Sequence, residues 1–147
     1  MIYVEKCFRD IGGYNLMFHF NEKMDTAKAR ELNPIVLAFI GDAVYSLFVR
    51  ERLAFNSDKK AGELNKLAVA EVKATAQAAF YTRIKGLLTA EEDNVFHRAR
   101  NAKKTTRAKS ATVAEYNVST GLEAVLGYLY VIGDIDRLNF LLNEGKE

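Results

Sequence analysis

The chain has 147 residues, of which 49% are hydrophobic and 27% are charged, a composition typical of one soluble globular domain and not of a disordered chain. A single cysteine excludes an internal disulfide, and one cysteine with two histidines argues against a structural zinc site. The net charge of +2 indicates no class of partner by itself. No run of about 20 apolar residues predicts a membrane span, and the first residues do not resemble a signal peptide, so a reduced cytoplasmic location is expected.

Residues 1–23 differ from the rest of the chain. They contain Gly12-Gly13 and scattered aromatic residues, without a helical or a strand period. Met24-Asp25 then begins a run with a plausible helix cap, which makes Met24 an alternative candidate for the first residue. We therefore expect an N-terminal appendage over 1–23 and a single domain over 24–147.

A long apolar helix is predicted from Pro34 to about Leu53. Asn33 supplies an N-cap, and proline is favoured at the first helical position. Apolar residues then fall on nearly every face of the helix, at Ile35, Val36, Leu37, Phe39, Ile40, Val44, Leu47, Phe48 and Val49. A helix that is apolar all round is expected inside a bundle and not on its surface.

The remaining elements are also predicted to be helical. The Ala-rich stretch 62–88 indicates two helices, and Thr89-x-x-Glu92 has the spacing of a capping box at the start of another. Residues 112–116 predict a short turn of helix, residues 119–123 open a second very apolar helix, and Gly133-Asp134 ends it and caps the last one. No strand pattern competes, so the sequence predicts an all-α bundle of about six or seven helices.

The two most apolar helices each carry one acidic residue. Asp42 lies in mid-helix, where a buried ionised carboxylate is unfavourable unless it is paired or binds a cation; a polar edge of the helix or an arginine partner would also explain it. Glu123 follows Thr120 at the capping-box spacing, so a cap is the simpler interpretation of this residue taken alone. If the two helices cross, both carboxylates can converge on one hard cation, for which Mg²⁺ is the natural candidate.

Positive charge is concentrated in the segment 98–109. It holds six of the 21 basic residues and no acidic residue, at Arg98, Arg100, Lys103, Lys104, Arg107 and Lys109. Such a patch suits a phosphate backbone, although a solvated basic loop would have the same composition. Together with the two carboxylates, the patch indicates a magnesium-dependent phosphodiester enzyme with a loop that faces nucleic acid.

Four blocks of the sequence resemble the ribonuclease III domain, and most closely its short branch, Mini-ribonuclease III, which lacks the separate double-stranded-RNA-binding domain. The blocks are residues 37–45 (Leu-Ala-Phe-Ile-Gly-Asp-Ala-Val-Tyr), 88–92, 98–103, and 116 with 119–130. Their order and spacing agree with that branch from about Glu31 to Leu142.

The resemblance implies an all-helical homodimer that cuts double-stranded RNA with Mg²⁺ and without a small-molecule cofactor. It also implies a role in the maturation of 23S ribosomal RNA, with no association with membranes. The acidic residues of the family's metal site fall on Asp42 and Glu123, which are therefore expected to be catalytic and to bind the metal. The RNA-binding loop of the family falls on Arg98, Arg100, Asn101, Lys103, Lys104, Arg107 and Lys109.

Several positions depart from the family pattern. Ala38 and Thr120 stand where full-length ribonuclease III has further acidic residues, as is usual for the short branch, so we expect a sparse metal site that phosphate oxygens complete. Ser46, Ala108 and Asn117 replace a glutamate, a proline and an arginine that are usual at those places. These three changes concern the fit of the substrate more than the chemistry.

Two other functions remain open from the sequence. The same fold could serve as a non-catalytic RNA-binding or ribosome-associated module, because a fold can persist after its chemistry is lost. The presence of both Asp42 and Glu123 argues against that alternative, and the small number of acidic residues argues mildly for it. A helical protein-interaction module with a merely solvated basic segment is the third possibility.

Overall fold

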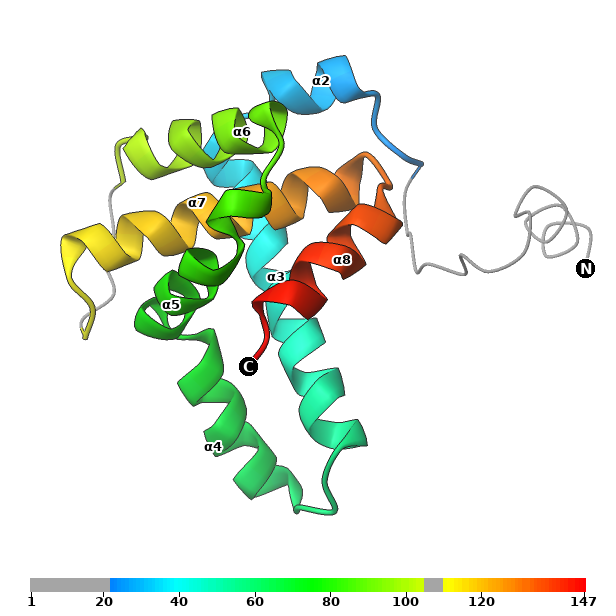
Figure 1. The fold of residues 1–147 in the computed structure, drawn as a ribbon, viewed down its shortest axis with the longest axis vertical. Helices are drawn as coiled ribbons and strands as arrows, with labels where there is room; N and C mark the ends of the chain where they lie inside the picture. The colour runs from blue at the N-terminus through cyan, green and yellow to red at the C-terminus, as the bar shows by residue number, and fades with distance from the viewer. Residues whose placement is uncertain (1–21, 105–109) are drawn as a thin grey trace, which may run out of the picture.

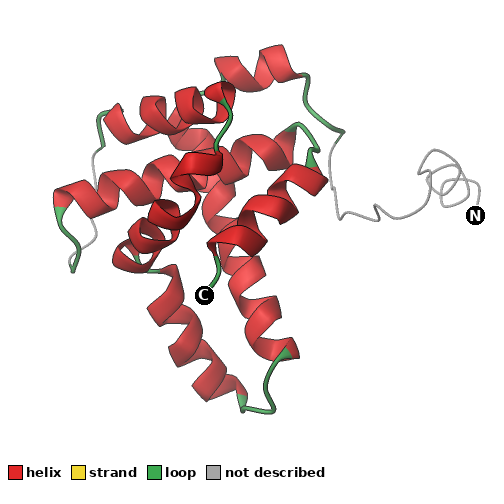
Figure 2. Cartoon of the chain, viewed as in Figure 1, coloured by secondary structure: helices red, strands yellow, loops and turns green. Residues whose placement is uncertain are grey.

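The computed structural model describes residues 22–104 and 110–147. Within these ranges it contains seven α-helices, one short 3-10 helix and no strand (Figure 2), which confirms the all-α prediction. None of the described helices is long and apolar enough to cross a membrane. The helices are α2 (Thr26–Glu31), α3 (Pro34–Phe55), α4 (Ala61–Val72), α5 (Ala74–Ile84), η1 (Lys85–Leu87), α6 (Ala90–Asn101), α7 (Val113–Val131) and α8 (Ile135–Gly145).

The predicted appendage falls mostly outside these ranges. Residues 1–21 of it are not among the described residues, so the division into 1–23 and 24–147 stays a prediction. From Met24 onward the chain is attached to the helical body, because the Met24 amide donates a hydrogen bond to the Val131 carbonyl at 2.7 Å.

Helix α7 lies at the centre of the fold. It contacts α2, α3, α5, α6 and α8, and Figure 1 shows α3 passing across it. Beyond this crossing the second half of α3 and the antiparallel α4 project from the body as a two-helix arm (Figure 1). The core surrounds α7 with buried side chains from its neighbours, among them Leu37, Tyr45, Val49, Phe80, Ile84, Val95, Phe96 and Leu138. The position of α7 therefore determines how the other helices are placed.

Three helix starts and one helix end predicted from local sequence are confirmed. The Asn33 side chain accepts a hydrogen bond from the Ile35 amide at 2.8 Å, with Pro34 at the first position of α3. Thr89 and Glu92 form the predicted capping box of α6. Gly133 has a φ of +71°, a left-handed conformation that favours glycine, and Asp134 caps α8.

One predicted boundary is wrong. Residues 112–116 and 119–131 belong to a single helix, α7, which begins with a capping box made by Thr112 and Glu115. Thr120 caps nothing, because its hydroxyl donates to the Tyr116 carbonyl one turn earlier at 3.0 Å. No glycine or proline interrupts 113–119, so the helix continues. Glu123 therefore lies within a helix, and its interpretation as a cap is excluded.

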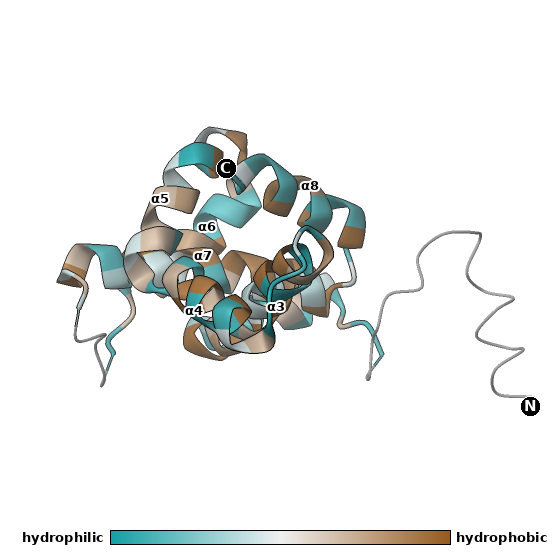
Figure 3. Ribbon diagram, turned by 90° about the horizontal axis from the view of Figure 1, so that it is seen from below, coloured by the Kyte–Doolittle hydropathy of each residue, from teal (hydrophilic) through white to brown (hydrophobic). Residues whose placement is uncertain are grey.

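The prediction that α3 is enclosed is also wrong. One side of α3 buries Leu37, Tyr45 and Val49, whereas Phe39 and Leu47 on the other side are 80% and 58% exposed. Apolar residues of α3 and α4, brown in Figure 3, are thus only partly covered by this chain. A sequence pattern that is apolar all round shows that both sides avoid water, but it does not show what covers each side.

Candidate active site

The site is built where α3 and α7 cross in direct backbone contact. A Cβ atom on Gly41 would lie 1.6 Å from the Glu123 carbonyl oxygen, and one on Gly127 would lie 2.0 Å from the Leu37 carbonyl oxygen. Real Cβ atoms do not come so close to a backbone atom, so this crossing requires glycine on both helices. Because Asp42 follows Gly41 and Glu123 faces Gly41, the crossing brings the two acidic residues together from positions 81 residues apart in the chain.

Asp42 is exposed, which corrects the expectation that it is buried. It lies on the open side of α3, and it makes no hydrogen bond or ion pair with any described residue. The arginine partner considered from the sequence is therefore absent from the described part of the chain, and Asp42 occupies the polar edge instead. Its carboxylate is available to a ligand.

Glu123 is the less accessible of the two carboxylates. The side-chain amide of Gln77 donates to its Oε1 atom at 2.9 Å. Burial raises the pKa of Glu123 to about 7, the hydrogen bond from Gln77 opposes this rise, and the negative charge of Asp42 adds to it. The contribution from Asp42 means that the two carboxylates lie close enough to interact electrostatically.

The donor set fits one hard cation. It offers two carboxylates, and among the described residues no cluster of three or more histidine, cysteine, aspartate or glutamate side chains is arranged to hold a metal. Zinc in structural sites takes four protein ligands, mainly nitrogen and sulfur. Mg²⁺ accepts oxygen ligands, keeps several water molecules, and is typically held by one or two carboxylates together with substrate phosphates. The arrangement thus suits Mg²⁺.

Gln77 is a site residue that the sequence did not reveal. It lies in the first turn of α5 with 2% of its surface exposed, and its Nε2 atom also donates to the Val72 carbonyl at 2.9 Å. The sequence contains one indication of its role, because Gln77 is the only long polar side chain among the small and apolar residues of 74–80. Its partner Glu123 is 46 residues away, so no local pattern connects them.

Two of the predicted RNA-binding residues donate hydrogen bonds to backbone carbonyl groups of the protein itself. The Arg98 guanidinium donates to the Arg30 carbonyl at 2.7 Å and so holds the end of α2. The Lys104 ammonium donates to the carbonyls of Arg100 and Ala102 at 2.9 and 3.0 Å, and burial lowers its pKa. Both residues stabilise helix ends, which are rich in unpaired carbonyl groups.

Three of the other predicted RNA-binding residues, Arg100, Asn101 and Lys103, lie at or just beyond the end of α6. Lys103 is exposed and has no partner among the described residues, while Arg100 covers the Phe96 ring and donates to the Asn101 side chain. Arg107 and Lys109 lie outside the described residues. A hollow of about 330 Å³ is lined by Ala102, Lys103, Lys104, Val113, Tyr116 and Asn117. This basic end of α7 is about 15 Å from Glu123 along the helix, at 1.5 Å per residue.

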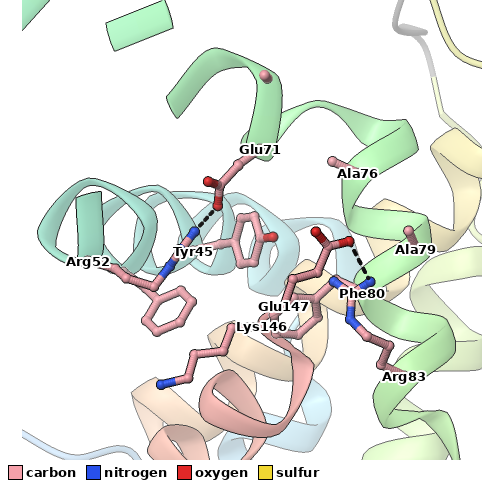
Figure 4. A pocket seen from close by; sticks show the side chains of 11 residues that line it. Tyr45, Arg52, Glu71, Ala76, Ala79, Phe80, Arg83, Lys146 and Glu147 are labelled. Atoms are coloured by element: carbon pink, nitrogen blue, oxygen red, sulfur yellow. Dashed lines mark hydrogen bonds and ion pairs between the residues drawn. The ribbon is translucent and has the colours of Figure 1, made fainter. Parts of the chain in front are cut away.

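A second hollow, of about 240 Å³, lies where α3 and α5 approach the end of α8 (Figure 4). It contains an ion pair between Arg52 and Glu71 and another between Arg83 and Glu147, the latter at 3.5 Å. Neither Asp42 nor Glu123 lines it. Because its carboxylates are paired with arginines, this hollow offers no second set of open metal ligands.

The raised pKa of Glu123 predicts a pH dependence of stability in metal-free buffer. The unfolded chain loses the Glu123 proton near 4.5 and the folded chain only near 7, so the free energy of unfolding should fall as the pH rises between these values. The Glu123→Gln variant lacks this titration and serves as the control. Chemical denaturation at several pH values measures the free energy of unfolding of both proteins. If this free energy depends on pH in the same way in the wild type and in Glu123→Gln, the prediction is contradicted. Added Mg²⁺ should stabilise the wild type most above pH 7.

Comparisons with known proteins identify the family of the chain. Residues 35–134 match the family described as Ribonuclease III domain. The chain is 39% identical to "Mini-ribonuclease 3" of Clostridium tetani, covering 85% of this chain and 83% of the relative, and 44% identical to that of Symbiobacterium thermophilum, covering 84% and 95%. A crystal structure of a protein from Fusobacterium nucleatum has a TM-score of 0.70 and 32% identity, covering 78% and 91%. The chain therefore belongs to the ribonuclease III family, in its Mini-ribonuclease 3 group, and is an endoribonuclease.

Proposed function

We propose that this endoribonuclease cuts double-stranded RNA at a site where Asp42 and Glu123 hold Mg²⁺, and that it acts in the maturation of 23S ribosomal RNA. The observation that carries the chemistry is that the glycine crossing of α3 and α7 brings these two carboxylates close enough for the charge of Asp42 to act on Glu123. Enzymes of the family generally depend on a divalent metal, and the donor set described above favours Mg²⁺. The ribosomal target rests on the resemblance to the short branch.

The protein groups have distinct tasks in this proposal. Asp42 offers an unpaired carboxylate, and Glu123 offers the oxygen that Gln77 does not occupy, once its proton has left. Mg²⁺ held by these two carboxylates would stabilise negative charge at the phosphate and would activate water for attack. Lys103, in the basic segment 98–109, binds phosphates of the RNA backbone. Such contacts suit a duplex, because A-form RNA is recognised largely by its shape, phosphates and 2′-hydroxyl groups.

Cleavage of a perfectly paired RNA by the purified protein tests the proposed function. We expect two-strand cutting with Mg²⁺, its loss when a chelator is present in excess, and its recovery when Mg²⁺ is restored. Products are resolved on a denaturing gel, and binding is measured in parallel by a mobility shift. A protein that binds the duplex but leaves it intact under all three conditions would instead be the non-catalytic RNA-binding module.

Replacing Lys103 by alanine should weaken duplex binding and flatten its dependence on salt. Each phosphate contact that is lost reduces the slope of log affinity against log salt by about 0.9 for a duplex. Lys103 is preferred to Lys104 for this test because the Lys104 ammonium holds the end of α6. Fluorescence anisotropy at several salt concentrations measures the slope. The exposed Lys85 in η1 is the matched control, and an unchanged slope in Lys103→Ala would argue against phosphate contact.

The open side of α3 supports a homodimer. Val36, Phe39, Ala43 and Leu47 are all exposed and follow one another at spacings of three and four residues, so they lie on one side of the helix. An apolar surface of this kind on a central helix is typical of a protein–protein contact, and dimerisation is general in this family. A second copy can cover the same surface on both subunits through a two-fold axis.

Replacing Phe39 by serine should separate the two subunits. Truncation of a central aromatic residue in an interface costs about 2 kcal/mol or more, which raises the dimer dissociation constant roughly thirtyfold. Phe140→Ser is the matched control, because Phe140 is also exposed but lies on α8. Sedimentation velocity over a range of concentrations measures both variants. Equal dissociation constants for the two variants would place the interface elsewhere.

A further inference from the structure

The amide of Gln77 is held in one orientation by two acceptors. Its Nε2 atom donates to the Val72 carbonyl and to the Glu123 carboxylate, each at 2.9 Å. The Val72 carbonyl and the ionised Glu123 carboxylate can only accept hydrogen bonds. If the amide group of Gln77 were turned by 180°, its oxygen would face these two acceptor oxygens, so that orientation is unfavourable. Gln77 therefore links the end of α4 to the centre of α7 through both of its N–H groups.

This orientation leaves the Gln77 Oε1 atom buried without a hydrogen-bond partner among the described residues. A buried acceptor without a donor is unfavourable. An apolar side chain of the same length would pack between α4, α5 and α7 without that cost. What the amide provides, and an apolar side chain cannot, is a hydrogen bond that fixes the position of Glu123.

The donor to Glu123 is the uncharged amide of Gln77, and the absence of a positive charge is important beside a cation site. A lysine or arginine at this position would neutralise Glu123 and repel a divalent cation. The amide instead donates to Oε1 without cancelling the negative charge of the ionised carboxylate, and no described residue donates to Oε2. Glu123 is thus held in place with one oxygen open.

We propose that Gln77 is a positioning residue that fixes the side chain of Glu123 and thereby sets the affinity of the site for its divalent cation. This inference rests on the proposed function, since it assigns Gln77 a task at the same site. A positioning role and a purely structural role of Gln77 lead to different expected results. A structural role affects the stability of the fold, whereas a positioning role changes metal affinity even where stability is preserved.

Gln77→Met separates the two roles, because methionine keeps the length of the side chain and removes both N–H donors. We expect the dissociation constant for Mn²⁺ to rise about tenfold or more, as is typical when a partner of a metal ligand is removed. Electron paramagnetic resonance of free Mn²⁺ measures this binding without any catalytic turnover. In duplex cleavage, the Mg²⁺ concentration for half-maximal rate should rise by a similar factor, while the rate at saturating Mg²⁺ stays within a few-fold of wild type.

Phe80→Leu is the matched control for stability. Phe80 lies one turn beyond Gln77 on α5, is equally buried and packs against the Tyr45 ring at 5.3 Å, and no hydrogen bond joins it to Glu123. This variant should lower the melting temperature and leave the Mn²⁺ affinity unchanged. Gln77→Leu provides a second test if the methionine variant does not fold.

The positioning role is overturned if Gln77→Met binds Mn²⁺ as tightly as the wild type. It is equally overturned if Phe80→Leu loses as much affinity at the same loss of thermal stability. The proposed function fails by a separate result, namely a wild-type protein that does not cut duplex RNA with Mg²⁺. Wild-type cleavage combined with an unchanged Gln77→Met would therefore reject the inference about Gln77 alone.

Discussion

Replacing Asp42 by asparagine, or Glu123 by glutamine, should abolish duplex cleavage and leave RNA binding nearly unchanged. Each substitution keeps the size of the side chain and removes the negative charge that we propose holds Mg²⁺. Loss of several kcal/mol of stabilisation of the transition state corresponds to a rate lower by about a thousandfold or more. The basic end of α7 is not altered, so the phosphate contacts that dominate affinity remain.

The two variants should also remain folded. Asp42 makes no hydrogen bond or ion pair with a described residue, and the amide oxygen of a glutamine at position 123 can still accept the hydrogen bond from Gln77. Asp58→Asn and Glu144→Gln, at exposed positions away from the crossing, are the matched controls. Initial cleavage rates, anisotropy titrations and melting curves measure the three properties. Normal cutting by either site variant would refute the assignment of these carboxylates.

A single methyl group at the helix crossing should be as damaging as the loss of a carboxylate. In Gly41→Ala the new Cβ atom would lie 1.6 Å from the Glu123 carbonyl oxygen, so α3 and α7 must move apart. Overpacking in a core costs about 1–3 kcal/mol and occasionally more, and the upper part of this range applies because the obstacle is backbone that cannot rotate away. Separation of the helices also moves Asp42 away from Glu123, so cleavage should be lost together with stability.

Gly62→Ala is the matched control for this prediction. It introduces the same methyl group in helix α4, where the new Cβ atom would meet nothing within 4 Å apart from its chain neighbours and the backbone of its own helix. Alanine is favoured over glycine within a helix by about 0.5–1 kcal/mol, so this variant should be slightly more stable than the wild type and equally active. Denaturant unfolding and cleavage assays on both variants make the comparison. A Gly41→Ala protein with wild-type stability and activity would mean that the two helices do not touch.

Features that depend on neighbouring residues were predictable from the sequence. The caps at Asn33, Thr89 and Asp134 are confirmed, because a cap is a contact between residues two or three positions apart. The break expected near Ser119 was wrong, since Ser-Thr-Gly resembles a local helix start while the burial of α7 on several sides favours a continuous helix. Tertiary packing overrides a weak local signal of this kind.

Features that depend on distant partners were predictable only in part. The sequence indicated two carboxylates in two apolar helices, and the resemblance to the ribonuclease III domain implied that both belong to one metal site. Their catalytic role stays a prediction. The exposure of Asp42 and the open side of α3 could not be derived, because periodicity shows that a face is apolar and not what lies against it. Gln77 was missed because its carboxylate partner comes from another helix.

The sequence by itself determined the helical character of the described residues, several helix ends, the family and the identity of the acidic and basic residues, since composition, capping and motif spacing are local properties. Only the tertiary structure decided that Gly41 and Gly127 let two helices touch, that this contact brings Asp42 within electrostatic reach of Glu123, and that Gln77 donates a hydrogen bond to Glu123. The physical reason is that the distance between two backbones depends on the absence of side chains on both, which neither segment encodes alone.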